Sequence, residues 1–586
     1  MTIKEALSKF DTIDKKGFYM HDVEGALSAV EECEKNNPEY EYEILAFGLQ
    51  PQHANNPWGN FYYGPRITLS DENGNPFYIP SFAQITPNAI LYWEQRYKET
   101  SNPLLTMRYA SLVWDFKRSI AKTNFDNDLY RVLVDCLLAV CNEDYETHPT
   151  ITVNDLEHLF ELAKNQQEYL IKCKSAYCNF EKRHDDDKAV RCWSSRFLMM
   201  LKYKKCFSEE EKQNIVREHE SRLTRLNTPD KNGRIDPWII EKQAMLLADY
   251  YNTLQKKEEI KRVLSVVEKA FVQEKKHMSG LQFAGNLEMI QRLYSHYQLH
   301  DEAKRLLFDV QKATEQSIKE MNPQKVEFDI PKEVFEQADL MFGEKCSSDE
   351  ERWNNFIIYF IPNKTQEEAN LKELARKYPF RFMMTTKLMD AKGRPTSTIG
   401  PIGEDFDSNL THHIAENMNL SFHFLEMAIK RLIQTDAITT AKIIDNFIMP
   451  CPLFEEERYN IIRESLDFFF NGNYVLFCHL IVPQIENAIC NLVELSGLSA
   501  LKQQKNNKGF QLKTLDDLLR EQPVVDAFTE DGSYYLRIVL TNQLGLNIRN
   551  LLCHGLLPAE HFGYGAAGRL LHILLMIGKV RFVEVK

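Results

Sequence analysis

The chain has little of what membrane insertion or export requires. Its longest apolar stretches, such as residues 570–577, are far shorter than the roughly 20 residues that span a bilayer. The first residues, 1–5, begin an amphipathic helix and contain no apolar signal-peptide core. We therefore expect a soluble, cytoplasmic protein with no membrane partner.

Common signatures of catalysis and metal binding are also missing. The twelve cysteines form no Cys-x-x-Cys motif and no paired framework, so we expect reduced thiols. There is no P-loop motif and no Gly-x-Ser-x-Gly nucleophile elbow. The spacing of Cys173, Cys178, His184 and Cys192 fits no common zinc site, which favours packing thiols over a metal. We expect neither a metal nor a cofactor.

Positive charge is scarce, which limits how the chain can bind nucleic acid. The formal net charge is −13, whereas broad coating of nucleic acid needs clustered Lys and Arg. Residues 473–586 contain 11 Lys and Arg against 10 Asp and Glu, a net charge of +1, so the remainder carries −14. One loop there is basic and lacks acidic residues; its lysines are Lys502, Lys505, Lys508 and Lys513. They are RNA-binding candidates, although a solvated loop is the simpler interpretation.

The length of 586 residues exceeds what one core supports, and the patterns predict a mainly α protein of several parts. Residues 1–116 are predicted to form a small α+β domain. Its strands are expected at 66–70 and 77–80, on either side of an Asn-Gly turn. Helices are expected at 89–97 and 104–116.

Residues 117–350 are predicted to form a helical-repeat region. The pattern is helical with few glycines and prolines, and an internal repeat occurs at an offset of 43 residues. Each copy is a helix, a short polar turn and a second helix, which is the unit of a solenoid-like array. The repeated positions are Tyr251, Gln255, Glu259, Lys261, Arg262, Leu264, Val267, Lys269 and Ala270, which recur as Tyr294, Gln298, Glu302, Lys304, Arg305, Leu307, Val310, Lys312 and Ala313.

Residues 351–410 break the helical pattern and are predicted to be a β-containing linker. A strand is expected at 380–388 and a return strand at 396–399, joined by a turn at 390–395. The acidic residues Glu404, Asp405 and Asp407 follow. They could ligate a metal, but a solvated loop is favoured because no further ligand stands at a fixed spacing.

Residues 411–586 are predicted to form a helical bundle, because apolar helices follow one another with short connections. The expected helices are 455–470, 474–495, 514–521, 534–543 continuing through a glycine to 545–554, and 562–579. His412 and His413 are expected on different faces of a helix, with no ligand assigned to either.

The most informative segment is residues 544–557, an apolar helix that carries Arg549, Asn550 and His554. A guanidinium holds a phosphate by paired hydrogen bonds, and an imidazole moves a proton near neutral pH. These residue types can therefore perform phosphodiester chemistry without a metal.

The geometry of a regular helix separates the two groups. Arg549 and His554 would point about 140° apart, whereas Asn550 and His554 would lie about 40° apart on one face. Two copies meeting across a two-fold axis would bring an arginine and a histidine together. The structural alternative is that Arg549 pairs with a buried carboxylate such as Glu486, and that His554 only caps the helix.

The Arg-Asn-x-x-x-His arrangement at residues 549–554 resembles the Arg-x4-His signature of ribonucleases in the HEPN superfamily (higher eukaryotes and prokaryotes nucleotide-binding). The resemblance extends to residues 479–490, which include Glu486, and to residues 92–93 and 102–114. In this combination the chain is similar to a family of long bacterial proteins with a C-terminal HEPN-like helical bundle.

The resemblance implies metal-independent RNA cleavage by a homodimer formed through the C-terminal bundle. Arg549 would hold the scissile phosphate, His554 would act as general base or acid, and Asn550 would orient one of them, with Glu486 in support. The implied substrate is tRNA or mRNA, and the implied role is a toxin-like effector in anti-phage defence, with a partner defence protein or inhibitor. The alternatives are a non-catalytic helical-repeat scaffold and a nucleotide- or RNA-binding subunit of a defence complex.

Overall fold

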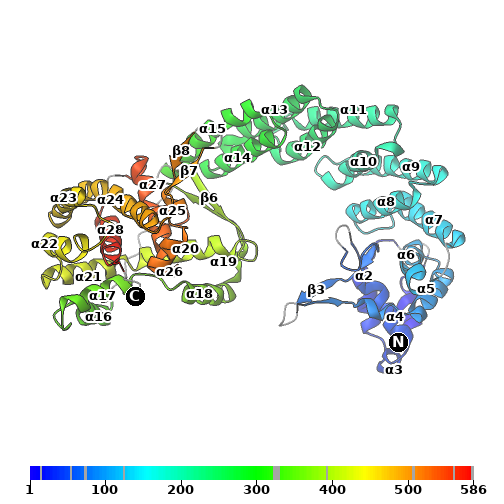
Figure 1. The fold of residues 1–586 in the computed structure, drawn as a ribbon. Helices are drawn as coiled ribbons and strands as arrows, with labels where there is room; N and C mark the ends of the chain where they lie inside the picture. The colour runs from blue at the N-terminus through cyan, green and yellow to red at the C-terminus, as the bar shows by residue number, and fades with distance from the viewer. Residues whose placement is uncertain are drawn as a thin grey trace. The chain divides into compact units, whose positions relative to one another are not determined.

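The protein is mainly helical, with 69% helix and 5% strand, which confirms the predicted fold class at that level. The computed structural model describes residues 1–12, 16–52, 56–70, 75–122, 126–320, 330–390, 393–504, 509–558 and 561–582. The chain divides into two compact units, Met1–Val310 and Gln311–Lys586 (Figure 1). The finer division at residues 116, 350 and 410 stays a prediction.

The first unit begins with short helices and two small antiparallel sheets. The pairing of β3 with β4 sets Ile67 opposite Ile79, which confirms the two predicted strands; the predicted turn at 71–74 lies outside the described residues. The elements of this part are α1 (Ile3–Ser8), α2 (Met20–Ser28), α3 (Glu32–Lys35), α4 (Pro38–Gly48), β1 (Gln50–Pro51), β2 (Tyr63–Gly64), β3 (Ile67–Ser70), β4 (Pro76–Ile79), η1 (Phe82–Gln84), α5 (Pro87–Glu99) and α6 (Pro103–Ile120).

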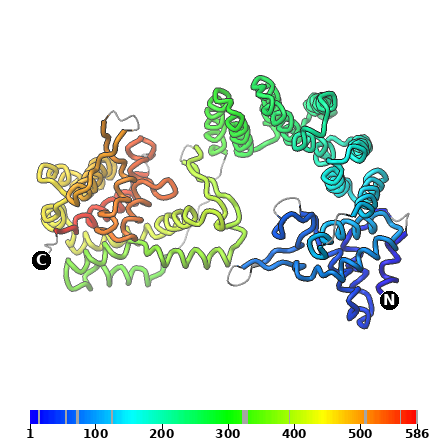
Figure 2. The backbone as a smooth tube through the Cα atoms, turned by 45° about the vertical axis from the view of Figure 1, so that its right-hand side comes forward, coloured from blue at the N-terminus to red at the C-terminus, as the bar shows by residue number. Residues whose placement is uncertain are grey.

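Helices follow one another from α7 onward (Figure 2). They are α7 (Asn127–Glu143), α8 (Pro149–Ala163), α9 (Gln167–Arg183), α10 (Val190–Lys202), α11 (Glu209–Leu226), α12 (Pro237–Thr253), α13 (Lys257–Glu274), α14 (Gly280–His296) and α15 (His300–Lys319), with 3-10 turns η2 (Lys204–Cys206) and η3 (Lys275–His277). The two repeat copies are the hairpins α12–α13 and α14–α15, as predicted. Equivalent turn residues, Gln255 and Gln298, both adopt the left-handed conformation, with φ of 56° and 58°.

The repeat also preserves an ion-pair pattern. The Tyr251 hydroxyl and the Arg262 guanidinium both donate to Glu220 of α11. The Tyr294 hydroxyl and Arg305 occupy the equivalent positions one hairpin later, and both donate to Glu268 of α13. Each hairpin is thus tied to the helix before it, as expected where a repeat buries its face only against its neighbours.

The second unit contains the remaining elements. These are α16 (Lys332–Phe342), α17 (Asp349–Tyr359), α18 (Lys364–Lys377), α19 (Pro379–Met383), β5 (Thr386–Met389), β6 (Pro395–Ile399), α20 (Phe406–Leu420), α21 (Phe422–Gln434), α22 (Thr440–Ile443), the π-helical turn η4 (Ile444–Ile448), the 3-10 turn η5 (Glu456–Arg458), α23 (Tyr459–Phe470), α24 (Tyr474–Leu495), β7 (Leu501–Gln503), β8 (Phe510–Leu512), α25 (Leu515–Leu518), α26 (Gln522–Leu540), α27 (Ile548–Cys553) and α28 (Tyr564–Ile577).

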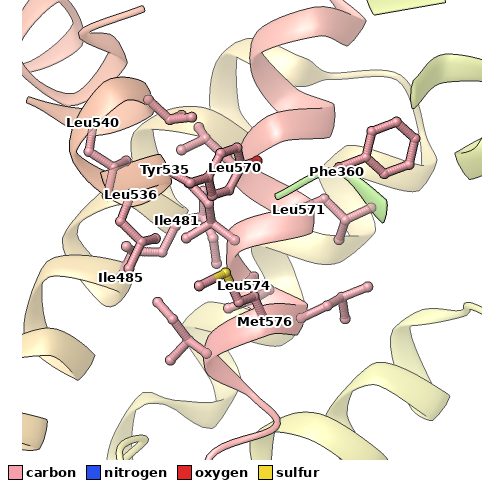
Figure 3. Packing of buried hydrophobic residues seen from close by; sticks show 14 of the residues in the cluster. Phe360, Ile481, Ile485, Tyr535, Leu536, Leu540, Leu570, Leu571, Leu574 and Met576 are labelled. Atoms are coloured by element: carbon pink, nitrogen blue, oxygen red, sulfur yellow. The ribbon is translucent and has the colours of Figure 1, made fainter. Parts of the chain in front are cut away.

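The core of the second unit surrounds α28. Every residue from Ala567 to Ile577 is buried, so this helix contacts protein on all sides. Figure 3 shows its leucines among residues of α24 and α26. The two polar residues of this buried stretch have partners: Arg569 donates to the Met418 carbonyl at 2.8 Å, and His572 lies 2.8 Å from the Tyr535 hydroxyl.

Helix α24 is, within the described residues, the one helix long and apolar enough by composition to cross a membrane. Ten of its residues are buried in the core just described. Such burial is typical of the central helix of a folded bundle.

The structure corrects the strand predicted at 380–388. The chain forms α19 there first, and β5 begins only at Thr386. Pro379 stands at the first helical position, where its fixed φ favours a helix and its missing N–H costs nothing. The return strand at 396–399 is confirmed within β6.

The helix predicted at 545–554 is also shorter than expected. The chain leaves α26 at Leu540, and α27 begins only at Ile548. Leu546 donates its backbone N–H to the Ile538 carbonyl at 2.8 Å, and Asn547 turns the chain with a φ of 50°. The loop folds back along α26 so closely that a Cβ on Gly545 would overlap the carbonyl oxygen of Ile538.

Gly545→Ala should therefore lower the apparent melting temperature of the second unit by several degrees. Overpacking against fixed backbone costs about 1–3 kcal/mol. Gly403→Ala is the matched control, because a Cβ there would meet nothing within 4 Å. Scanning calorimetry of both variants measures the difference, and equal melting temperatures would contradict the close approach.

Candidate functional site

Arg549 is held by a two-point ion pair with Glu486, which joins α27 to α24. Its Nε donates to one carboxylate oxygen and its Nη2 to the other, each at 3.0 Å. The Arg549 side chain is 25% exposed and that of Glu486 is 20% exposed, so the pair lies at the edge of the core. The hydrogen bonds from Arg549 to Glu486 raise the pKa of the guanidinium.

Asn550 is fixed by three hydrogen bonds. Its Oδ1 accepts from Nη1 of Arg549 at 3.0 Å. Its Nδ2 donates to the Thr541 carbonyl at 3.1 Å and to Oδ1 of Asn547 at 2.8 Å. Both amide hydrogens are used, so the amide oxygen is held toward Arg549 and the loop before α27 is held to the helix.

His554 follows the last residue of α27 as its C-cap, and Gly555 then turns the chain with a φ of 64°. The backbone N–H of His554 donates to the Asn550 carbonyl at 3.1 Å. The residue is exposed. Within the described part of the chain its imidazole has no hydrogen-bond partner, so it is open to solvent and to a ligand.

One cavity brings these residues together. Arg549, Asn550 and His554 all line a space of about 1100 Å³ in the second unit. This volume is at the upper end of the range typical of ligand sites. The β5–β6 hairpin and α20 contribute further lining residues. Glu486 lies behind Arg549 and does not line the cavity.

Several further polar residues line the same cavity and were not predicted there, among them His412, His561 and Asp516. His412 Nε2 lies 3.7 Å from Glu416, whereas His413 lies 3.3 Å from Glu367, so the two adjacent histidines do face different neighbours, as predicted. No spacing in the sequence connects these residues to Arg549, because the fold brings them together from distant segments.

Two lysines of the basic loop, Lys502 and Lys513, are neutralised by ion pairs. Lys502 pairs with Asp517 at 2.5 Å, and Lys513 pairs with Glu521 at 2.6 Å. The hydrogen bond from Lys502 helps to lower the pKa of Asp517 to about 2. Neither lysine lines the cavity. Lys505 and Lys508 lie outside the described residues.

The other candidate clusters have structural partners. Asp405 accepts the backbone N–H of Gly400 at 3.1 Å, and Cys178 accepts a hydrogen bond from Arg196 at 3.2 Å. Cys173 and Cys192 are buried, and burial raises the pKa of each thiol. Among the described residues, no group of three or more His, Cys, Asp or Glu is arranged to hold a metal ion.

Comparison of the chain with models of protein families, with curated proteins and with solved structures gives no match. The functional argument therefore depends on the residues and the geometry described above.

The ion pair predicts a measurable coupling between Glu486 and Arg549. In a double-mutant cycle with Glu486→Gln and Arg549→Gln, the interaction free energy should be about 1–3 kcal/mol, between the values for exposed and buried pairs. The free energy of unfolding of the second unit, from urea titration, measures it.

The Glu426–Lys430 pair is the control. It lies on one helix at 2.7 Å with the lysine 55% exposed, and such pairs contribute about 0.3–0.5 kcal/mol. Equal coupling in the two cycles would mean that the Glu486–Arg549 contact does not fix α27.

Proposed function

We propose that the protein is a metal-independent endoribonuclease of the HEPN type, with its active site in the cavity lined by Arg549, Asn550 and His554. The observation that carries the proposal is that one cavity contains a fixed guanidinium and an exposed imidazole. These are the groups that RNA cleavage through the ribose 2′-hydroxyl requires.

In the proposed mechanism Arg549 binds the scissile phosphate. A guanidinium has five N–H donors. Three are used by Glu486 and Asn550. The remaining two are available to phosphate oxygens, and Glu486 sets the angle at which they face the cavity. Stabilising the charge that develops on phosphorus is the main contribution expected of this group.

His554 transfers the proton. As general base it removes the proton of the 2′-hydroxyl, whose oxygen attacks phosphorus while the bond to the 5′-oxygen breaks. The products are a 2′,3′-cyclic phosphate and a 5′-hydroxyl. The leaving oxygen needs an acid as well. A second copy of the chain would supply its own His554 for this role. Within one chain, His412 and His561 also line the cavity.

The proposed biological role is that of a cytoplasmic, homodimeric, toxin-like effector in anti-phage defence, with tRNA or mRNA as its substrate. The first unit, with its helical repeats, would sense a trigger, or bind a partner that holds the nuclease inactive. Residues 1–472 carry a net charge of −14 and residues 473–586 a net charge of +1, so the acidic part of the chain, which includes residues 311–472 of the second unit, would repel RNA from the nearly neutral C-terminal segment.

One observation favours the alternative, a non-catalytic scaffold or a nucleotide- or RNA-binding subunit of a defence complex. Glu486 offers Arg549 a full bidentate partner, and a guanidinium satisfied in this way is typical of structural ion pairs. Under this alternative Arg549 serves the fold, and His554 caps α27.

The nuclease proposal predicts that Arg549→Ala and His554→Ala each reduce cleavage of total RNA by at least about 100-fold, the usual contribution of an acid–base group. Cleavage by the unaltered protein should persist in EDTA and leave 2′,3′-cyclic phosphate ends. His423→Ala, an exposed histidine outside the cavity, is the control. Activity that disappears in EDTA and returns with magnesium would contradict the mechanism.

The regulatory proposal predicts that the second unit is more harmful alone than within the full chain. Expression of residues 311–586, the compact unit of the structure, should slow bacterial growth more than the full chain does. The same fragment with His554→Ala should restore growth. Equal growth with soluble fragment and soluble full chain would count against inhibition by the first unit.

A further inference from the structure

A second cavity, of about 460 Å³, lies in the second unit beside the first. Three cations line it: Lys364 of α18, Arg520 after α25 and Arg537 of α26. Two carboxylates, Asp407 and Glu530, line it as well. Leu544 lines both cavities, so they adjoin across the loop that precedes α27.

Arg520 and Arg537 are brought together and share one carboxylate. Both pair with Asp516, at 2.9 Å for Arg520 and 3.9 Å for Arg537. Nε of Arg537 is buried and has no hydrogen-bond partner among the described residues. Burial and the charge of Arg520 both lower the pKa of the Arg537 guanidinium. An anion between the two would relieve this repulsion and give Nε of Arg537 a hydrogen-bond partner.

The remaining lining suits a larger ligand than a bare ion. The ring of Tyr534 has the charged groups of Lys364 and Arg537 at 5.4 and 5.8 Å, and its hydroxyl lies 2.7 Å from the Thr411 hydroxyl. Glu530 pairs with Lys364 at 3.0 Å, but its side chain is 76% exposed and can swing aside. Carboxylates at the rim accept hydrogen bonds from sugar hydroxyls, as acidic residues do in nucleotide sites.

The backbone is strained at this cavity. Thr529 interrupts α26 with a φ of 66° and a ψ of 170°, a conformation that is an outlier for a β-branched residue. After this break Glu530, Tyr534 and Arg537 follow at helical spacing and line the cavity on one face. The strained residue thus sets the direction of the segment that carries the binding groups.

We propose that this second cavity binds the phosphate group of a nucleotide, with Arg520, Arg537 and Lys364 as its ligands. The phosphate belongs to a free nucleotide or to an RNA strand that continues out of the first cavity. Binding to this site does not require that the protein cleave RNA, so it is tested separately from the nuclease activity.

The test uses calorimetric titration of the full chain with inorganic phosphate, with AMP and with a short RNA oligonucleotide, on a His554→Ala background so that RNA stays intact. Arg520→Gln is the main variant, because its side chain is 53% exposed and its loss should not disturb folding. Arg537→Lys, which keeps the charge but loses the guanidinium donors, is the second. Arg463→Gln, an exposed arginine on α23 outside both cavities, is the matched control.

Loss of the guanidinium donors should weaken binding about tenfold in Arg520→Gln and in Arg537→Lys, with no change in Arg463→Gln. Binding of AMP and phosphate that depends on Arg520 identifies a free nucleotide as the ligand. Binding of the oligonucleotide alone, with the same dependence, identifies the RNA strand. If none of the three probes binds, or if Arg463→Gln weakens binding as much as Arg520→Gln, the proposal is wrong.

Discussion

The ion pair between Glu486 and Arg549 is the contact on which the candidate site depends. Helix α27 has six residues, too few to be stable alone, and its N-cap Asn547 makes no side-chain capping hydrogen bond to it. Helix α24, by contrast, is fixed by ten buried residues. The pair therefore acts together with Ile548 and Leu552, which are buried in the core, to fix a short helix at the edge of a cavity. Asn550 extends the same restraint to the preceding loop through Thr541 and Asn547.

The same pair bears on whether Arg549 has a structural or a catalytic role. A bidentate carboxylate neutralises much of the charge that would attract a phosphate, which lowers ground-state affinity. The same carboxylate holds the guanidinium in one orientation, which lowers the entropy lost when the transition state forms. Catalysis needs only that the two free N–H donors of Arg549 bind the transition state better than the substrate. A strong structural pair and a catalytic role are therefore compatible.

The sequence predicts this fold well where signals are local. The bounds of α24 follow from Asn471-Gly472 before it and Ser496-Gly497 after it. The repeat is visible as matched residues whose turns adopt the same conformation. Prediction from the sequence fails where contacts between distant segments determine the local structure. Gly545 is read as an interruption within a helix, yet its role is to let the chain fold back on Ile538. The pair of Glu486 with Arg549 could be anticipated because both lie in apolar helices, whereas His412 and Asp516 join the site only through tertiary structure.

Asp516 connects the two cavities physically. It lines the first cavity, while its carboxylate pairs with Arg520 and Arg537 of the second. Its Oδ1 accepts from the Thr541 hydroxyl at 2.9 Å, and the carbonyl of Thr541 in turn accepts from Asn550. An anion that took over the two arginines would leave the Thr541 hydroxyl as the partner of Asp516 and so change the restraint on Asn550 and Arg549. Coupling of this kind is reciprocal by thermodynamic necessity. A phosphate bound in the first cavity would then alter affinity in the second by the same factor.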